Sequence, residues 1–355
     1  MPPSAPPTTE HVAPQEVPAS GALLRRVAGL LVLVAALALV VSVLPGLQDV
    51  RDRFNRAEPG WLAVTFGCVL ASTLSYVAAL RGTLSRQPGW RASWNLGMAE
   101  QGSNVLLPTG GIGGPALGAV VMRRAGVPSA VATPRSAALF LLTSAASFVA
   151  IVLAGIVGGL GLLAGGVSWV GTLLPAALAV AAIAGVAALA RLPVAGPSEK
   201  RRFAARWASR LGALLRDGVQ ESFSLLRARD PLVIGGCVGY LGFAIAALGA
   251  SFQAFGGEGP PIAAFVLAYT LGQVGALIPT PGGLGGTEGG LIGMYVLYGA
   301  PAASTTAAVL AYRVFQLGLP AFFGLIAFGR IRRRLRDAEL TAEVAARFDA
   351  DSETP

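Results

Sequence analysis

The first candidates for chemistry in this sequence are ionisable side chains that lie inside apolar segments. Four residues meet this description: Glu100, Arg135, Glu288 and Arg313. A charge in apolar surroundings is costly, so a buried charge is usually paired or serves a function. Glu288 and Arg313 are therefore expected either to neutralise each other as a structural pair or to line a polar path. Arg135 lies near the end of its segment and could extend its charge toward the lipid headgroups.

Neutral polar side chains accompany these charges at helical spacing. Asn104 follows Glu100 by four residues and shares its helical face, and Gln101 adds an adjacent amide. Gln316 follows Arg313 by three residues, so the two side chains lie on nearly the same face of a helix. These residues are candidates for lining or binding sites along a substrate path.

Two loops rich in glycine and proline, at 107–115 and 279–286, interrupt apolar segments. Proline lacks an amide donor and clashes with the preceding turn, so neither loop can continue a helix. The free amides of such a loop could bind an anion such as a phosphate headgroup, or its glycines could simply permit tight backbone packing. Neither loop has the Gly-Lys-Ser/Thr ending of a Walker motif, nor the preceding strand of a dinucleotide site. The candidate glycines are Gly110, Gly111, Gly113, Gly114, Gly282, Gly283, Gly285 and Gly286.

The composition excludes several other kinds of site. One histidine and two cysteines cannot build a zinc finger, a haem site or a disulfide framework. We therefore predict no metal, no cofactor and no catalytic residue. The 27 basic residues exceed the 18 acidic ones, but the arginines cluster beside apolar segments. That placement indicates contact with anionic lipid headgroups rather than nucleic acid.

The elements that must position these residues are membrane helices. Hydrophobic residues make up 54% of the chain and charged residues only 13%, whereas soluble domains carry roughly 25% charged residues. We predict an all-α integral membrane protein with about six full transmembrane helices and two broken segments, eight hydrophobic segments in all. A cleaved signal peptide is the alternative for the first run, which is long for that role. The continuous runs are 27–44, 60–80, 136–163, 169–190, 231–255 and 302–329, and the broken ones are 92–127 and 261–300.

The two broken segments resemble each other. An offset of 172 places Gln101 on Gln273 and the glycines of the first loop on those of the second. This match predicts two repeats, at about 21–163 and 169–330, in which each broken segment folds back as a re-entrant hairpin. Three full spans per repeat would make the second repeat inverted relative to the first. Full crossing by both broken segments is the alternative.

Basic residues predict the orientation, because cytoplasmic loops carry the excess of arginine and lysine. The connector 191–230, segment 81–91 and the end of the last span are strongly basic, whereas 164–168 and 256–260 carry no basic residue. Both termini are therefore expected in the cytoplasm. The connector is expected to form an amphipathic helix, either on anionic lipid at the interface or packed on the bundle. The remaining parts are a disordered tail at 1–20 and a cytoplasmic tail at 331–355.

The second half of the chain resembles the lysylphosphatidylglycerol synthase transmembrane-region family of flippase-like membrane proteins. The resemblance rests on the segment from Leu277 to Gly290 together with Ala311-Tyr312-Arg313. It implies a helical bundle with re-entrant helices that moves or handles lipids across the inner membrane. Many members carry an acid and an arginine after the first loop, where this chain has Pro115, Ala116 and Gly118, which puts the substrate in doubt. The matching positions are Pro281, Gly282, Gly283, Gly285, Glu288, Gly289, Tyr312 and Arg313.

Together these observations predict a multi-pass protein of the cytoplasmic membrane that translocates a lipid through a central cavity. The lipid would be a phospholipid or glycolipid with a polar, anionic or glycosylated headgroup. The alternative is an accessory subunit of a lipid-modifying enzyme, such as an aminoacyl-lipid synthase or a lipid-linked glycosyltransferase, or a scaffold. We expect that the chain is not itself an enzyme, since no soluble catalytic domain is evident in it. A homo-oligomer and a partner enzyme both stay open.

Overall fold

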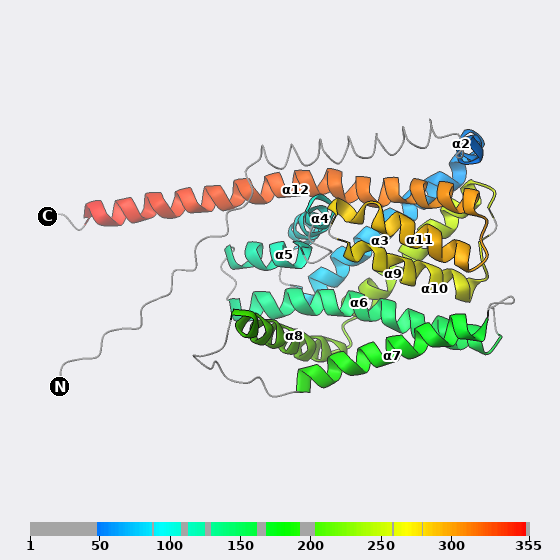
Figure 1. The fold of residues 1–355 in the computed structure, drawn as a ribbon. Helices are drawn as coiled ribbons and strands as arrows, with labels where there is room; N and C mark the ends of the chain where they lie inside the picture. Colours follow the sequence, from blue (N-terminus) through cyan, green and yellow to red (C-terminus); the bar gives the residue numbers. More distant parts are fainter. Residues whose placement is uncertain are drawn as a thin grey trace.

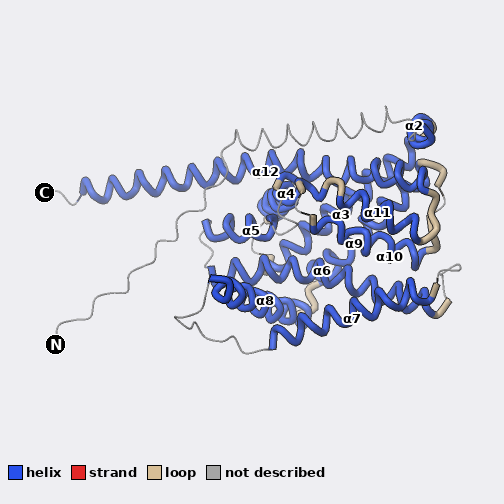
Figure 2. The backbone as a smooth tube through the Cα atoms, viewed as in Figure 1, coloured by secondary structure: helices blue, strands red, loops and turns tan. Residues whose placement is uncertain are grey.

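The chain forms a bundle of helices in the computed structural model, and strands are absent from the residues that it describes (Figures 1 and 2). The description covers 48–86, 89–107, 113–124, 129–161, 168–191, 203–257, 259–278 and 280–352. The predicted tail at 1–20 and the predicted span at 27–44 lie outside these residues.

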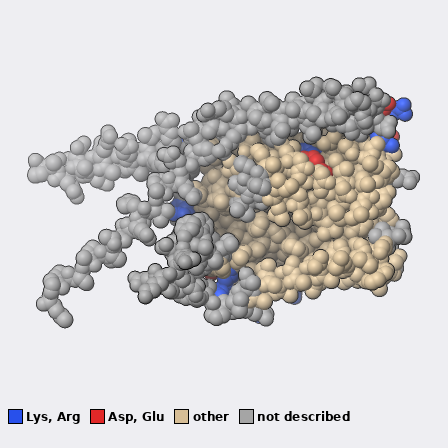
Figure 3. Space-filling model, viewed as in Figure 1, with Lys and Arg blue, Asp and Glu red and all other residues tan. Residues whose placement is uncertain are grey.

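Five helices contain segments that are long and apolar enough to cross a membrane. They match the remaining continuous apolar runs, so the prediction of membrane helices is confirmed for those five. Large apolar side chains cover their outer faces, as on Trp169 and Leu178, and Figure 3 shows little charge on the visible face between the ends of the bundle. The five helices are α3 (Pro59–Thr83), α6 (Ser129–Gly159), α7 (Trp169–Arg191), α9 (Pro231–Ala254) and α12 (Ala302–Ser352).

Small residues allow the helices at the centre of the bundle to approach closely. A side chain at Gly236 of α9 would collide with the backbone of α3 at Ala79, and Ser72 of α3 donates a hydrogen bond of 2.7 Å to the carbonyl of Tyr240. Such contacts are typical of membrane helices, where no hydrophobic force draws apolar faces together and close packing replaces it.

Both broken segments are interrupted where the glycine and proline runs predict. The first contains α4 (Trp90–Leu106) and α5 (Gly113–Arg124), and the second contains α10 (Ile262–Gly272), η2 (Gln273–Leu277), η3 (Pro281–Gly283) and α11 (Gly286–Leu297). The helices α5 and α11 have 12 residues each. At 1.5 Å per residue they are about 18 Å long, well short of the ~30 Å hydrocarbon core of a bilayer.

The helices that follow the broken segments run in opposite directions. In Figure 1, α6 runs from the end near α8 toward the end near α2, and α12, along the top of the bundle, runs back in the opposite direction. The break in the first segment therefore leads into α6 from one end of the bundle, and the break in the second leads into α12 from the other. The helix α12 continues without interruption beyond the bundle to Ser352, through the predicted tail.

Two further helices lie at the ends of the bundle: α2 (Gln48–Asn55) and α8 (Phe203–Arg227). The predicted helix in the connector is therefore present as α8. Its C-terminal half packs on α6, where Gly218 lies against Ala137 and Arg135 forms an ion pair of 3.5 Å with Glu221. Packing on the bundle thus accounts for this half, and the same ion pair gives Arg135 a partner within the protein.

Candidate functional site

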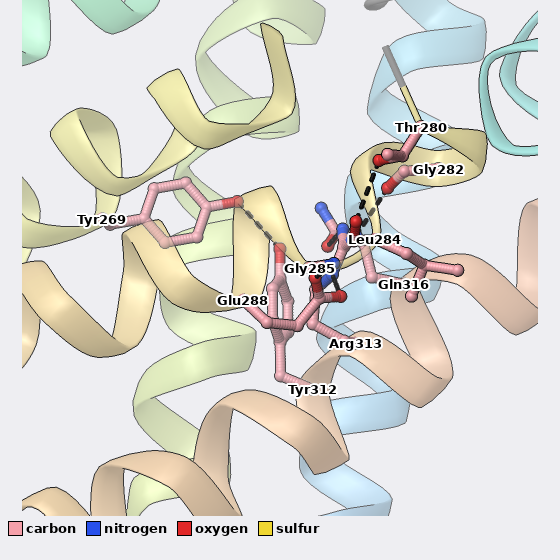
Figure 4. A network of polar contacts seen from close by, with 9 residues as sticks. All are labelled: Tyr269, Thr280, Gly282, Leu284, Gly285, Glu288, Tyr312, Arg313 and Gln316. Atoms are coloured by element: carbon pink, nitrogen blue, oxygen red, sulfur yellow. Dashed lines mark hydrogen bonds and ion pairs between the residues drawn. The ribbon is translucent and has the colours of Figure 1, made fainter. Parts of the chain in front are cut away.

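The loop between η2 and α11 has a backbone that only glycine adopts readily. Gly282 has φ 63° and Gly285 has φ 83°, in the left-handed region that side chains with a Cβ disfavour. Thr280 closes the loop, because its hydroxyl donates a hydrogen bond of 2.9 Å to the carbonyl of Leu284 (Figure 4). The helix α11 begins immediately after Gly285.

Glu288 connects this loop to α11 and α12. One carboxylate oxygen accepts a hydrogen bond of 2.7 Å from the amide of Gly285, which precedes the first turn of α11. The other oxygen forms an ion pair of 2.6 Å with Nε of Arg313 on α12 (Figure 4). An acid in the first turn of a helix also interacts favourably with the helix dipole, so the position of Glu288 suits a carboxylate.

Arg313 makes three hydrogen bonds in different directions. Besides the bond to Glu288, its Nη1 donates to the side-chain oxygen of Gln316 at 2.8 Å and its Nη2 donates to the carbonyl of Gly282 at 2.6 Å. The side chains of Arg313 and Glu288 are only 7% and 8% exposed. The pairing expected from the sequence is therefore present, and it joins the glycine loop, α11 and α12 at one point.

Other glycines of the second segment serve close packing. A Cβ atom on Gly286 would overlap the carbonyl of Gly275, and one on Gly290 would overlap the carbonyl of Gly272. The backbones of α10 and η2 therefore touch that of α11 along this line. This is the packing role that the sequence left as one of two interpretations. Anion binding by the loop stays a prediction.

A separate polar cluster lies in the first segment. The buried Glu100 accepts a hydrogen bond of 2.8 Å from the hydroxyl of Tyr76 on α3, and Gly118 of α5 leaves the space that its carboxyl fills. Asn104 accepts a hydrogen bond of 2.6 Å from the amide of Gly114, so the shared face of Glu100 and Asn104 holds α5 against α4. Gly113 opens α5, whereas Gly110 and Gly111 lie outside the described residues.

A cavity of about 250 Å³ lies among α3, α6, α9 and α12, and both broken segments border it. It brings together four residues predicted from the sequence, namely Gln101 of α4, Gln273 at the start of η2, and Tyr312 and Gln316 of α12. The hydroxyls of Tyr312 and Tyr269 lie 2.8 Å apart at its wall (Figure 4). The predicted residues that the structure describes fall into three groups. The first lines this cavity, the second is the Glu288–Arg313 network with Pro281 and the glycines of the second loop, and the third is the Glu100 cluster.

Several residues of the cavity and of the Glu100 cluster were not predicted from the sequence. They are hydroxyl-bearing side chains, which carry no charge and are common in membrane helices. Their spacing is the signal that could have identified them: polar positions one, three or four residues apart in otherwise apolar runs mark one helix face. These residues are Ser72, Thr73, Tyr76, Thr143, Ser144, Ser147, Tyr240 and Tyr269.

No group of three metal-binding side chains is found among the described residues.

A search of curated proteins finds no match to the chain. The profile described as the lysylphosphatidylglycerol synthase TM region, in contrast, matches residues 26–324. This match spans both broken segments and four of the five apolar helices, and it ends within the fifth, α12. The chain therefore belongs to the lysylphosphatidylglycerol synthase transmembrane-region family, whose members are membrane proteins associated with lipid handling.

Proposed function

We propose that the chain translocates a lipid across the cytoplasmic membrane, with the headgroup passing through the central cavity while the acyl chains stay in the bilayer. The observation that carries this proposal is the position of the cavity. Its wall includes Ser72, Ser144 and Tyr240, which lie near the middle of α3, α6 and α9. Polar groups at this depth are costly unless they contact protein, water or a polar substrate.

The proposal includes an inverted repeat with two re-entrant hairpins. It is supported by the short helices α5 and α11, which cannot cross a bilayer alone, and by the opposite directions of α6 and α12. It is also supported by Gln101 and Gln273, which are equivalent in the two repeats and border the same cavity. Broken helices that meet near the midplane around a substrate site are a recurring arrangement in transporters.

We further propose that the end of the bundle bearing α8 faces the cytoplasm, as do both termini. Cysteine labelling from either side of the membrane tests this orientation in a variant without Cys68 and Cys237. Single cysteines at Gly126 and at the exposed Gly259 are expected to react from opposite sides. Labelling of both from the same side would contradict the inverted arrangement.

Transport is tested by reconstituting the purified chain into vesicles that contain headgroup-labelled lipids. We expect faster movement between leaflets for a lipid with a polar headgroup than in protein-free vesicles. If no anionic or glycosylated lipid moves faster, the proposal is wrong. Enrichment of a lipid-modifying enzyme with an inactive chain would instead favour an accessory subunit.

A further inference from the structure

The central cavity has an uncharged lining that is rich in hydrogen-bonding groups. Three amide side chains border it, from Gln101, Gln273 and Gln316, together with tyrosine, serine and threonine hydroxyls. No charged side chain is part of this lining among the described residues. At ~30 Å³ per water, its volume of about 250 Å³ corresponds to roughly eight waters, so it suits a group the size of one sugar ring.

The nitrogen of one of these amides has no hydrogen-bond partner among the residues that the structure describes. The side-chain nitrogen of Gln101 is buried without a hydrogen bond, and the residue as a whole is only 9% exposed. Leaving a buried donor unpaired is unfavourable, and Gln101 borders the cavity, so an acceptor there would stabilise this nitrogen. A hydroxyl or ether oxygen of a ligand would supply it.

The charges near the cavity do not favour an anionic ligand. Arg313 is the basic residue closest in sequence to the lining residues Tyr312 and Gln316, and its guanidinium already bonds to Glu288, Gln316 and Gly282. A phosphate in this cavity would therefore lose its hydration without gaining a free cation, which is costly. The hydrogen bond from Arg313 also occupies the amide oxygen of Gln316. The amide nitrogen of Gln316 is therefore the group that remains to contact a ligand.

An apolar groove adjoins the cavity. It has a volume of about 590 Å³ and lies between α6, α9 and α10, with Val149, Leu153, Val238, Ile245 and Val266 in its wall. Leu241 borders both the groove and the cavity, and Thr143 faces the cavity while its neighbour Leu142 faces the groove. The polar cavity and the apolar groove therefore meet at the same level of α6 and α9. A lipid requires this arrangement where its polar headgroup joins its acyl chains.

We propose that this composite site binds a lipid with an uncharged, hydroxyl-rich headgroup, a sugar or another polyol. The headgroup occupies the cavity and bonds to the amide of Gln101, and an acyl chain lies in the groove between α6, α9 and α10. This inference rests on the proposed function and specifies its substrate class.

Binding of fluorescent monoglucosyl diacylglycerol to the full chain tests the proposal. The protein is held in zwitterionic micelles, because detergents with sugar headgroups would compete for the site. Unlabelled monoglucosyl diacylglycerol, phosphatidic acid, diacylglycerol and free glucose serve as competitors. We expect the glucolipid to compete best, diacylglycerol and phosphatidic acid to compete less, and glucose to compete only at far higher concentration.

Two variants with matched controls locate the site. Gln101→Met should weaken glucolipid binding about 2- to 10-fold, the effect of losing one hydrogen bond, whereas Gln253→Met on the exposed face of α9 should not change it. Gly242→Leu should fill the groove and weaken glucolipid and diacylglycerol alike, whereas Gly293→Leu at an open position of α11 should weaken neither. If Gln101→Met does not fold, Gln273→Met replaces it.

Equal or tighter binding of phosphatidic acid would overturn the proposal, as would unchanged glucolipid binding in the glutamine variant. Competition by free glucose as effective as that by the glucolipid would refute the role of the groove. The vesicle assay separates this inference from the proposed function. Transport without glutamine-dependent glucolipid binding refutes only the inference, and such binding without transport refutes only the proposed function.

Discussion

Removing the carboxylate of Glu288 is expected to destabilise the protein strongly. In Glu288→Gln the amide oxygen can still accept from Gly285, but Arg313 loses the partner at 2.6 Å in a site where its side chain is only 7% exposed. Breaking a buried ion pair by removing one partner costs about 3–5 kcal/mol. Because Arg313 keeps its bonds to Gln316 and Gly282, we expect a loss near the lower end, about 3 kcal/mol.

Removing the cation should cost more. Arg313→Met deletes all three hydrogen bonds and leaves Glu288 buried with one amide donor, so we expect a loss near 5 kcal/mol, the upper end of the same range. The double variant leaves neither charge unpaired. It should therefore be less destabilised than the sum of the two single variants, by about 2–3 kcal/mol.

The assay is the free energy of unfolding of the purified protein in mixed detergent micelles. Glu221→Gln is the matched control, because its pair with Arg135 is longer and about one quarter exposed, and exposed pairs contribute below about 1 kcal/mol. Single variants whose effects add to within about 0.5 kcal/mol would refute the reasoning. If the single variants are stable and only transport is lost, the pair handles substrate and does not lock the fold.

Three further predictions concern packing, hydrogen bonding and pH. Gly290→Ala should destabilise the protein by about 1–3 kcal/mol because the new methyl group meets a carbonyl of α10. Gly293→Ala, at an open position of the same helix, should be neutral or stabilising. Unfolding titrations of the two variants compare their free energies of unfolding. Tyr76→Phe should cost about 1–3 kcal/mol because it removes the hydrogen bond to the buried carboxyl of α4, and equal stability of variant and wild type would contradict that contact. The Arg86 guanidinium, 2.9 Å away, lowers the pKa of Asp230 below its usual value, so the pair stabilises the fold above the unfolded pKa and this contribution is lost as the pH falls through the folded pKa. Asp230→Asn keeps an acceptor for the Leu232 amide at the start of α9. It should therefore lower the melting temperature slightly at pH 7 and by less at pH 3; an equal difference at both values would refute the assignment.

Much of the architecture could be predicted because membrane helices have a strong sequence signal. Five continuous apolar runs became apolar helices, and both glycine and proline runs became breaks. The partners Glu288 and Arg313 could also be anticipated, since a buried arginine needs a counter-charge and the second broken segment offers one acid.

The cavity could not be predicted in the same way. Gln101 and Gln273 were identified as repeat equivalents, but their meeting at one cavity depends on how α4 and α10 approach the spanning helices. Hydroxyl side chains such as Ser147 give no composition signal, because a serine in an apolar helix usually bonds to its own backbone. The partner of Glu100 was missed for a related reason: Tyr76 lies on a different helix, and its hydroxyl is neutral.

The proposed path through the cavity can be tested most directly by blocking it. Ser147→Phe places a ring in the cavity wall, and Ala181→Phe places the same ring on the exposed face of α7 as a control. The measurement is the rate at which a headgroup-labelled lipid moves between leaflets of vesicles that contain equal amounts of each protein. We predict that Ser147→Phe reduces this rate to that of protein-free vesicles and that Ala181→Phe leaves the wild-type rate unchanged. Equal rates for all three proteins would contradict passage through this cavity.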